Sequence, residues 1–167
     1  MNAAKAEHFL HFAIEINSNS MKLLSLFFLI LLVAPAKAQF DQSLADSVGA
    51  DEYGMRTYVM AFLKRGPNRD RSKEESARLQ RAHLDNIGRL AEEGKLVMAG
   101  PFFASPEDDL RGIYIFDVDS IEEAQALTET DPAIQAGSLV MELKKWYGSA
   151  ALKLMLPLSK MVTKKDI

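Results

Sequence analysis

Hydrophobic residues follow two different periods between residues 55 and 148, and each period predicts one type of element. Stretches rich in branched and aromatic residues, bounded by Gly, Pro or polar residues, predict strands. Two stretches that each begin with a Ser-x-x-Glu capping box predict helices. Their order, β-α-β-β-α-β, predicts an α+β fold of the ferredoxin-like type with an antiparallel sheet. The expected strands are 55–64, 95–99, 111–118 and 139–147, and the expected helices are 73–93 and 121–128.

Both faces of the expected sheet are apolar. Along residues 58–63, and again along 113–116, the side chains that point to opposite sides of the strand are largely hydrophobic. Two helices can cover only one face of a four-stranded sheet, and a solvated face would alternate apolar with polar residues. A large exposed apolar patch usually marks an interface. We therefore expect a homodimer that packs through the sheet face.

The most concentrated apolar run lies near the start of the chain. Residues 23–33 read LLSLFFLILLV, which is shorter than the about 20 apolar residues that a membrane-spanning helix needs. Met21-Lys22 precedes this run and Ala-Pro-Ala-Lys-Ala follows it, ending at residue 38. This order is typical of a secretory signal peptide over 21–38, with cleavage after Ala38 and export to the periplasm or the medium. The alternative is an uncleaved N-terminal anchor.

Three further segments flank the expected domain at 55–148. Residues 1–20 fit neither a signal peptide nor an anchor, and we interpret them as an upstream extension, with Met21 as the true start. The polar residues 39–54 predict a flexible lead-in. The basic tail, 149–167, has a helix-capable run that Pro157 should break. This tail either packs on the domain and frays, or binds a membrane surface or a partner.

Composition narrows the available chemistry. The 167 residues include 20 Lys and Arg against 23 Asp and Glu, and a net charge of −3 argues against a nucleic-acid partner. With zero cysteine there is no disulfide, no thiol nucleophile and no Cys-ligated zinc or iron–sulfur site. No phosphate-binding glycine loop and no GxSxG nucleophile elbow occurs. We expect neither a cofactor nor a metal, and the chain beyond residue 38 has a single histidine, His83.

His83 lies on the apolar side of the first predicted helix, in line with Leu79 and Ile87, and so should point toward the sheet. A buried imidazole needs a hydrogen-bond partner, and histidine is also suited to proton transfer near neutral pH. Asp131 stands before Pro132, where the second helix ends. Both helices lie on one face of such a sheet, so Asp131 can approach His83 and fix its tautomer. The spacing leaves open a structural histidine and a simple Asp-Pro turn.

Three runs resemble the YCII-related family over roughly residues 56 to 148. They are QRAHLDNIGRLAEEGKLVMAGPF, RGIYIFDVDSIEEAQAL and TDPAIQAGSLVMELKKW. The resemblance implies a dimeric α+β barrel similar to muconolactone isomerase, with an active site built on a His–Asp dyad, here His83 and Asp131. It also implies proton-transfer or lyase-type chemistry on small cyclic or aromatic compounds, including dehydrochlorination in some relatives. The family markers present are His83-Leu84, Ala99-Gly100-Pro101, Asp131-Pro132 and Trp146.

Five other residues are candidates for binding a substrate. Gly100 and Pro101 shape a turn and could admit a ligand close to the backbone. Phe102 could line a pocket or seal the core, and Tyr58 and Tyr114 could supply hydroxyl groups.

Two hypotheses follow. The first is an exported, cofactor-independent enzyme in which His83 is the general acid or base and Asp131 orients it. The second is a non-catalytic domain that binds a small ligand or a partner and holds a structural His–Asp pair. Membrane contact is expected only through an uncleaved signal segment or the basic tail.

Overall fold

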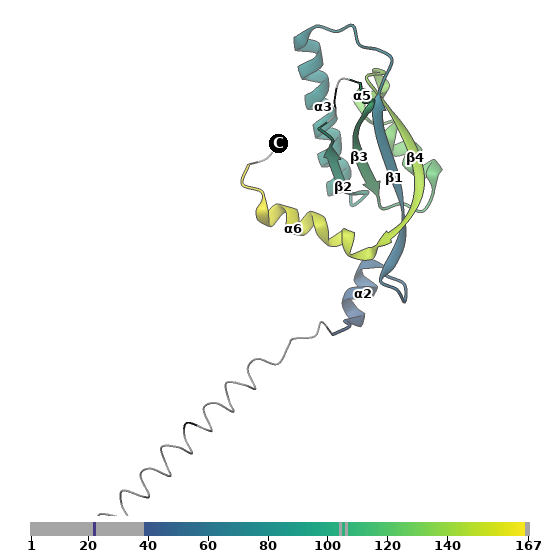
Figure 1. Cartoon of the computed structure of the whole chain (residues 1–167), viewed down its shortest axis with the longest axis vertical. Helices are drawn as coiled ribbons and strands as arrows, with labels where there is room; N and C mark the ends of the chain where they lie inside the picture. The colour runs from purple at the N-terminus through teal and green to yellow at the C-terminus, as the bar shows by residue number, and fades with distance from the viewer. Residues whose placement is uncertain (1–21, 23–38, 104, 106, 166–167) are drawn as a thin grey trace, which may run out of the picture. The chain divides into compact units, whose positions relative to one another are not determined.

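The computed structural model describes residue 22 and residues 39–165, except 104 and 106. The expected upstream extension (1–20) and, apart from residue 22, the expected signal peptide (21–38) lie outside the described residues. The β-α-β-β-α-β order is confirmed, with additional helices before, between and after the expected elements (Figure 1). The strands are β1 (Met55–Arg65), β2 (Leu96–Pro101), β3 (Leu110–Phe116) and β4 (Leu139–Ser149). The helices are α2 (Gln42–Val48), α3 (Lys73–Glu92), α4 (Ile121–Thr128), α5 (Pro132–Gln135), the 3-10 helix η1 (Ala150–Leu154) and α6 (Met155–Val162).

The four strands form one antiparallel sheet in the order β2-β3-β1-β4. β1 is central, and it pairs with β4 over its whole length, from Met55 opposite Ser149 to Arg65 opposite Leu139. Because β1 and β3 are adjacent although a helix and a strand separate them in the chain, the connections have the ferredoxin-like topology. The predicted α+β fold class is therefore confirmed.

The two main helices begin where the capping boxes predict. The Ser72 hydroxyl accepts a hydrogen bond from the Glu75 backbone N–H at 3.1 Å, and the Ser120 hydroxyl accepts one from Glu123 at 3.0 Å. These bonds satisfy N–H groups that have no partner inside the first turn of a helix. At the other end of α3, Gly94 has a φ of 69°, which a residue with a side chain adopts only at a cost.

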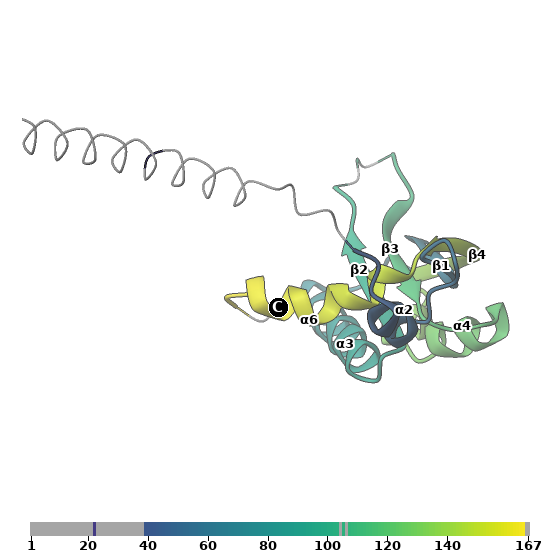
Figure 2. The same ribbon diagram turned by 90° about the horizontal axis from the view of Figure 1, so that it is seen from below.

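The main hydrophobic core lies between the sheet and the helices α3 and α4, and Figure 2 shows both helices on the same side of the sheet. Alternate residues of β1 and β3 face this layer and are almost completely buried. Leu90 of α3 and Ala124 of α4 close the layer from the helix side, each with 0% exposure. The core members are Val59, Ala61, Leu63, Leu90, Leu96, Tyr114, Phe116, Val118 and Ala124.

The opposite face of the sheet is partly covered by the chain itself. We had expected the whole of this face to be exposed and to form a dimer interface. Tyr58, Val97 and Ile115 form a second buried cluster there, and Leu152 of η1 packs against it. The tail is anchored by charge as well, because Asp117 pairs with Arg56 at 2.5 Å and with Lys153 at 2.9 Å. The chain's own C-terminal segment therefore covers part of the face that we assigned to a dimer.

Both segments that flank the domain contain helices. Residues 39–54, which we expected to be a flexible lead-in, contain α2, whose N-cap Asp41 accepts a hydrogen bond from the Leu44 N–H at 3.0 Å. Pro157 does not break the tail helix, because it is the third residue of α6. The N–H groups of a first turn have no intrahelical acceptor, so proline removes no bond there.

Within the described ranges, no helix is long and apolar enough to cross a membrane.

Candidate active site

His83 and Asp131 meet between α3 and α5, on the helix side of the sheet. Asp131 Oδ2 lies 2.7 Å from His83 Nδ1, and the two residues are 7% and 0% exposed. The sequence predicts that His83 points inward and that the end of the second helix approaches it, and the structure places both residues accordingly. A separation of 2.7 Å is a short, charge-assisted hydrogen bond.

Asp131 uses both oxygens of its carboxylate. It is the N-cap of α5, with Oδ1 accepting from the Ala133 backbone N–H at 2.8 Å, while Oδ2 faces the imidazole. Pro132 follows at the first helical position, where its fixed φ suits a helix start and its missing N–H costs nothing. The Asp-Pro turn and the dyad are therefore one arrangement, because the cap fixes the direction in which the carboxylate presents Oδ2.

The partners of the imidazole assign its tautomer. A buried carboxylate is an acceptor, so His83 Nδ1 carries the hydrogen and donates it to Asp131. Nε2 then has a free electron pair, and the Tyr114 hydroxyl donates to it at 3.3 Å. Burial, and secondarily the charge of Asp131, raise the pKa of Tyr114 well above its usual range, so this hydroxyl stays neutral and remains a donor. The result is a series of two hydrogen bonds, in which Tyr114 donates to His83 and His83 donates to Asp131.

A second polar group lies one helical turn beyond His83, and no motif in the sequence singles it out. Asn86 is 8% exposed, and its side-chain oxygen accepts from Arg89 at 2.8 Å and from the Thr130 hydroxyl at 3.1 Å. Arg89 also donates to Thr130 at 2.9 Å. These bonds join α3 to the turn that precedes Asp131, so they help to keep His83 and Asp131 next to each other.

The other candidates are separated from the dyad. Tyr58 lies on the opposite face of the sheet, where its hydroxyl donates to the carbonyls of Ser149 and Ala150 at 3.1 and 3.3 Å. Adjacent residues of a strand point to opposite faces, so Tyr58 and its neighbour Val59 could not both face the helices. Burial raises the pKa of Tyr58, and its hydroxyl anchors the start of η1.

Gly100 and Pro101 belong to β2, which is an edge strand of the sheet, and Phe102 directly follows it. Gly100 pairs with Ile113, one register position from Tyr114, and so faces away from the dyad. A Cβ on Gly112 would come within 2.5 Å of the Gly100 carbonyl oxygen, which shows how closely the two strands approach. Pro101 is exposed, and Phe102 is 46% exposed. Nothing in the described contacts brings these residues to His83.

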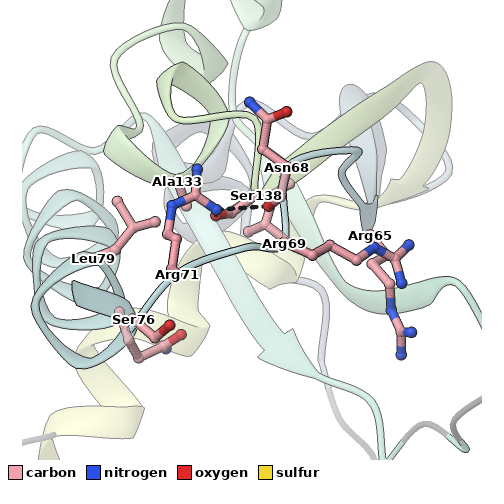
Figure 3. A pocket seen from close by; sticks show the side chains of 10 residues that line it. Arg65, Asn68, Arg69, Arg71, Ser76, Leu79, Ala133 and Ser138 are labelled. Atoms are coloured by element: carbon pink, nitrogen blue, oxygen red, sulfur yellow. Dashed lines mark hydrogen bonds between the residues drawn. The ribbon is translucent and has the colours of Figure 1, made fainter. Parts of the chain in front are cut away.

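A pocket of about 370 Å³ lies beside the dyad, where the loop after β1, the first turns of α3 and the α5–β4 turn come together (Figure 3). Ala133, whose N–H binds Asp131, forms part of its wall. Leu79 lines it as well, one turn before His83 on the same side of α3. The two arginines within residues 68–73 are the sequence signal that could have pointed to this pocket. Elsewhere in the described residues, no three His, Asp or Glu side chains gather as a metal site.

The fold and the buried pair together define a small ferredoxin-like α+β domain that holds a His–Asp dyad between its helices. A family model of the YCII-related domain matches residues 58–147, more than half of the chain. The chain therefore belongs to the YCII-related domain family, as its motifs predict.

Among the known proteins that are similar to this chain, one is a relative in sequence and one is a solved structure. The uncharacterized protein YjpA of Bacillus subtilis (strain 168) is 30% identical over 92 residues, which cover 55% of this chain and 95% of YjpA. Among solved structures, the 5-chloro-2-hydroxyhydroquinone dehydrochlorinase TftG of Burkholderia phenoliruptrix AC1100, in complex with 2,5-dihydroxybenzoquinone, is 20% identical with a TM-score of 0.40. That likeness covers 53% of this chain and 92% of TftG.

Proposed function

We propose that this protein is a cofactor-independent enzyme that moves a proton on a small cyclic or aromatic molecule, with His83 as the general base and acid. The observation that carries the proposal is the buried 2.7 Å contact between His83 Nδ1 and Asp131 Oδ2. A carboxylate on Nδ1 directs the electron pair of Nε2 toward its reaction partner and stabilises the imidazolium that forms.

The proton balance of such a step is simple. His83 Nε2 takes a proton from a carbon or oxygen of the substrate, and Asp131 stays ionised beside the doubly protonated ring. The same proton then returns to another substrate atom in an isomerase, or to the departing group in a lyase. Tyr114 stands where Nε2 would meet the substrate, but its 3.3 Å contact is longer than a usual O–H hydrogen bond of about 2.8 Å. A substrate atom can therefore compete for the electron pair, while the neutral Tyr114 hydroxyl turns to donate to a developing oxyanion.

One observation favours the second hypothesis, a structural pair in a non-catalytic domain. His83 is 7% exposed and Tyr114 is 2% exposed, and both ring nitrogens of His83 already have partners within the chain, namely Asp131 and Tyr114. In that case the Tyr114–His83–Asp131 chain serves to satisfy polar groups under α3 and α5. This function predicts an imidazole that does not respond to ring compounds.

Solvent exchange separates the two hypotheses without knowledge of the natural product. The full chain is incubated in D₂O with cyclohexane-1,4-dione, and loss of the carbon-bound protons next to its carbonyl groups is followed by NMR. Because exchange requires only proton abstraction, the enzyme hypothesis predicts acceleration that His83→Gln abolishes and Asp131→Asn reduces. Asp85→Asn, an exposed carboxylate on the same helix that pairs with Arg81, is the matched control. Equal exchange with wild type and His83→Gln would refute the catalytic role.

We also propose that the protein forms a homodimer through the part of the sheet face that the tail leaves uncovered. Phe62 and Ile113 are register partners on this face and are only half-buried, and Val140 nearby is 44% exposed. Apolar side chains grouped in this way favour a protein interface. Sedimentation at micromolar concentration tests the proposal. A clean monomer, or a dimer that persists in Phe62→Lys, would contradict it.

Export is a further proposal, supported by the pattern of residues 21–38. Intact mass and N-terminal sequencing of the protein from a secreting host should place the mature start at Gln39. An unprocessed N-terminus would favour the anchor instead. Detection of a peptide from residues 1–20 would contradict Met21 as the start.

A further inference from the structure

The pocket beside the dyad is built by a close approach of two backbone segments. Gly66 N–H donates to the Ser138 carbonyl at 2.8 Å, and Asn68 N–H donates to the Gly137 carbonyl at 3.0 Å. A Cβ on Gly66 would lie 2.2 Å from the Gly137 oxygen, so only glycine permits this contact. The loop after β1 is thereby fixed against the α5–β4 turn, and its arginines are carried to one place.

Arg71 is the charged group nearest the centre of this arrangement. Its guanidinium donates to the Asn68 carbonyl at 2.6 Å, to the Ser138 hydroxyl at 2.7 Å and to the Ala136 carbonyl. Figure 3 shows it reaching toward Ser138 and Ala133. All of these acceptors are neutral, so they orient the guanidinium without cancelling its charge. A guanidinium has five N–H donors, and those that the loop does not use remain for a ligand.

Two other arginines add to the positive charge. Arg65 and Arg69 also line the pocket, and in Figure 3 they extend away from Arg71. Within the described residues, Arg69 Nε donates to the Gly66 carbonyl at 3.3 Å and the Arg65 side chain forms no hydrogen bond. Among the residues that the structure describes, no carboxylate forms an ion pair with Arg65, Arg69 or Arg71. The pocket therefore holds positive charge that the described chain does not neutralise, next to a dyad whose carboxylate is negative.

Part of the pocket wall is apolar and belongs to residues close in sequence to the dyad. Leu79 and Ala133 belong to this wall, together with Leu139. Leu79 precedes His83 by four residues of α3, a rise of about 6 Å along the helix axis. A planar ring held against Leu79 by an anionic substituent at Arg71 would thus lie about one helical turn from His83.

We propose that this pocket binds the carboxylate of a small cyclic or aromatic acid, with Arg71 as the anchor, and so positions the ring at His83. The reaction at His83 rests on the proposed function, whereas the binding of the acid does not. A bidentate guanidinium–carboxylate contact is the arrangement that the unused donors of Arg71 permit. Arg65 and Arg69 attract the anion from a greater distance.

The test is a titration of the isotopically labelled full chain, followed by backbone amide and imidazole ¹⁵N chemical shifts. Benzoate is the probe, benzamide is its neutral counterpart, and inorganic phosphate is an anion without a ring. We expect benzoate to shift the amides of Ser76, Ala133 and Ser138 at a Kd that neither benzamide nor phosphate approaches. Arg71→Gln should raise this Kd by about tenfold or more, the range for one charge-assisted contact.

Control variants keep the test decisive. Arg71 also holds the loop, so Arg69→Gln, which loses a single bond to Gly66, is measured in parallel and should raise the Kd by about two- to fivefold. Arg78→Gln removes the same charge from an exposed position of α3 that does not line the pocket, and should leave the Kd unchanged. Equal shifts with benzoate and benzamide, tighter binding of phosphate than of benzoate, or an unchanged Kd in both pocket variants would overturn the inference.

The same spectra separate this inference from the proposed function. The amides around Arg71 report on the pocket, whereas the His83 ring nitrogens report on the dyad. Arginine-dependent binding in His83→Gln, together with no exchange activity in the wild type, would support the acid-binding pocket and refute the enzyme. Exchange activity on the uncharged dione without arginine-dependent binding of benzoate would refute the pocket and support the enzyme.

Discussion

Asp131→Asn tests the dyad with the least disturbance to the fold. The amide oxygen of asparagine can still accept from the Ala133 N–H, which Asp131 Oδ1 binds at 2.8 Å, so the cap of α5 is retained. The amide NH₂ group then faces His83 Nδ1, where the carboxylate accepted a hydrogen bond at 2.7 Å. Two donors cannot share one hydrogen bond, so the imidazole must move its hydrogen to Nε2. Nε2–H would then donate to Tyr114, and Nε2 would no longer have the free electron pair that accepts a proton from the substrate.

The expected magnitude follows from the burial of the pair. A hydrogen bond to a charged group contributes about 1.5–3 kcal/mol and a neutral one about 0.5–1.5 kcal/mol, so Asp131→Asn should lower the free energy of unfolding by about 1–2 kcal/mol. Asp131→Ala removes the cap as well and leaves two buried donors without partners, for a loss of about 3–5 kcal/mol. In a domain of this size each kcal/mol lowers the Tm by roughly 3–6 °C.

Two measurements check this reasoning. Urea denaturation gives the free energy of unfolding, and ¹⁵N NMR of the ring nitrogens identifies which one carries the hydrogen. Asp85→Asn, at a carboxylate whose side chain is 67% exposed, should change stability by less than about 0.5 kcal/mol. If Asp131→Asn keeps the hydrogen on Nδ1, or if it is as destabilising as Asp131→Ala, the assigned directions of the hydrogen bonds are wrong.

Three further variants test the surroundings of the site. Tyr114→Phe should be less sensitive to alkali than wild type. Burial holds the pKa of Tyr114 in the folded protein above the ordinary value of 10.0. Above about pH 10 the unfolded chain therefore loses the hydroxyl proton that the folded protein keeps, so the free energy of unfolding falls as pH rises, whereas below about pH 10 Tyr114 causes no such loss. The wild type should therefore lose up to about 1.4 kcal/mol per pH unit relative to Tyr114→Phe in urea denaturation above that pH, and parallel curves would contradict the assignment. Gly66→Ala should cost about 2 kcal/mol or more, because the new Cβ would lie 2.2 Å from the Gly137 oxygen and the loop must separate from the turn. Gly88→Ala, with no atom within 4 Å of the new Cβ, should instead stabilise α3 by about 0.5–1 kcal/mol, and equal thermal shifts for the two variants would argue against the close approach.

Local patterns were sufficient for most of the architecture. The capping boxes at Ser72 and Ser120 predict both main helices, because a cap depends on residues three apart in the chain. The inward direction of His83 follows from helical periodicity in the same way. The tail was harder to predict, since whether Pro157 breaks a helix depends on its position within that helix. The sequence also could not predict that Leu152 covers part of the second sheet face. An apolar strand face is compatible both with a dimer interface and with a tail that packs on it.

The sequence by itself determined the fold class, from the order of the elements that local patterns predict, and the family motifs, whose resemblance implies the His83–Asp131 dyad. Only the tertiary structure decided that Asp131 binds His83 Nδ1, that Tyr114 rather than Tyr58 joins them, and that Arg71 lies beside a pocket next to them. These contacts connect residues that are 31 to 67 positions apart. Their geometry depends on strand register and on a glycine contact between two turns, and no periodicity within one segment encodes either.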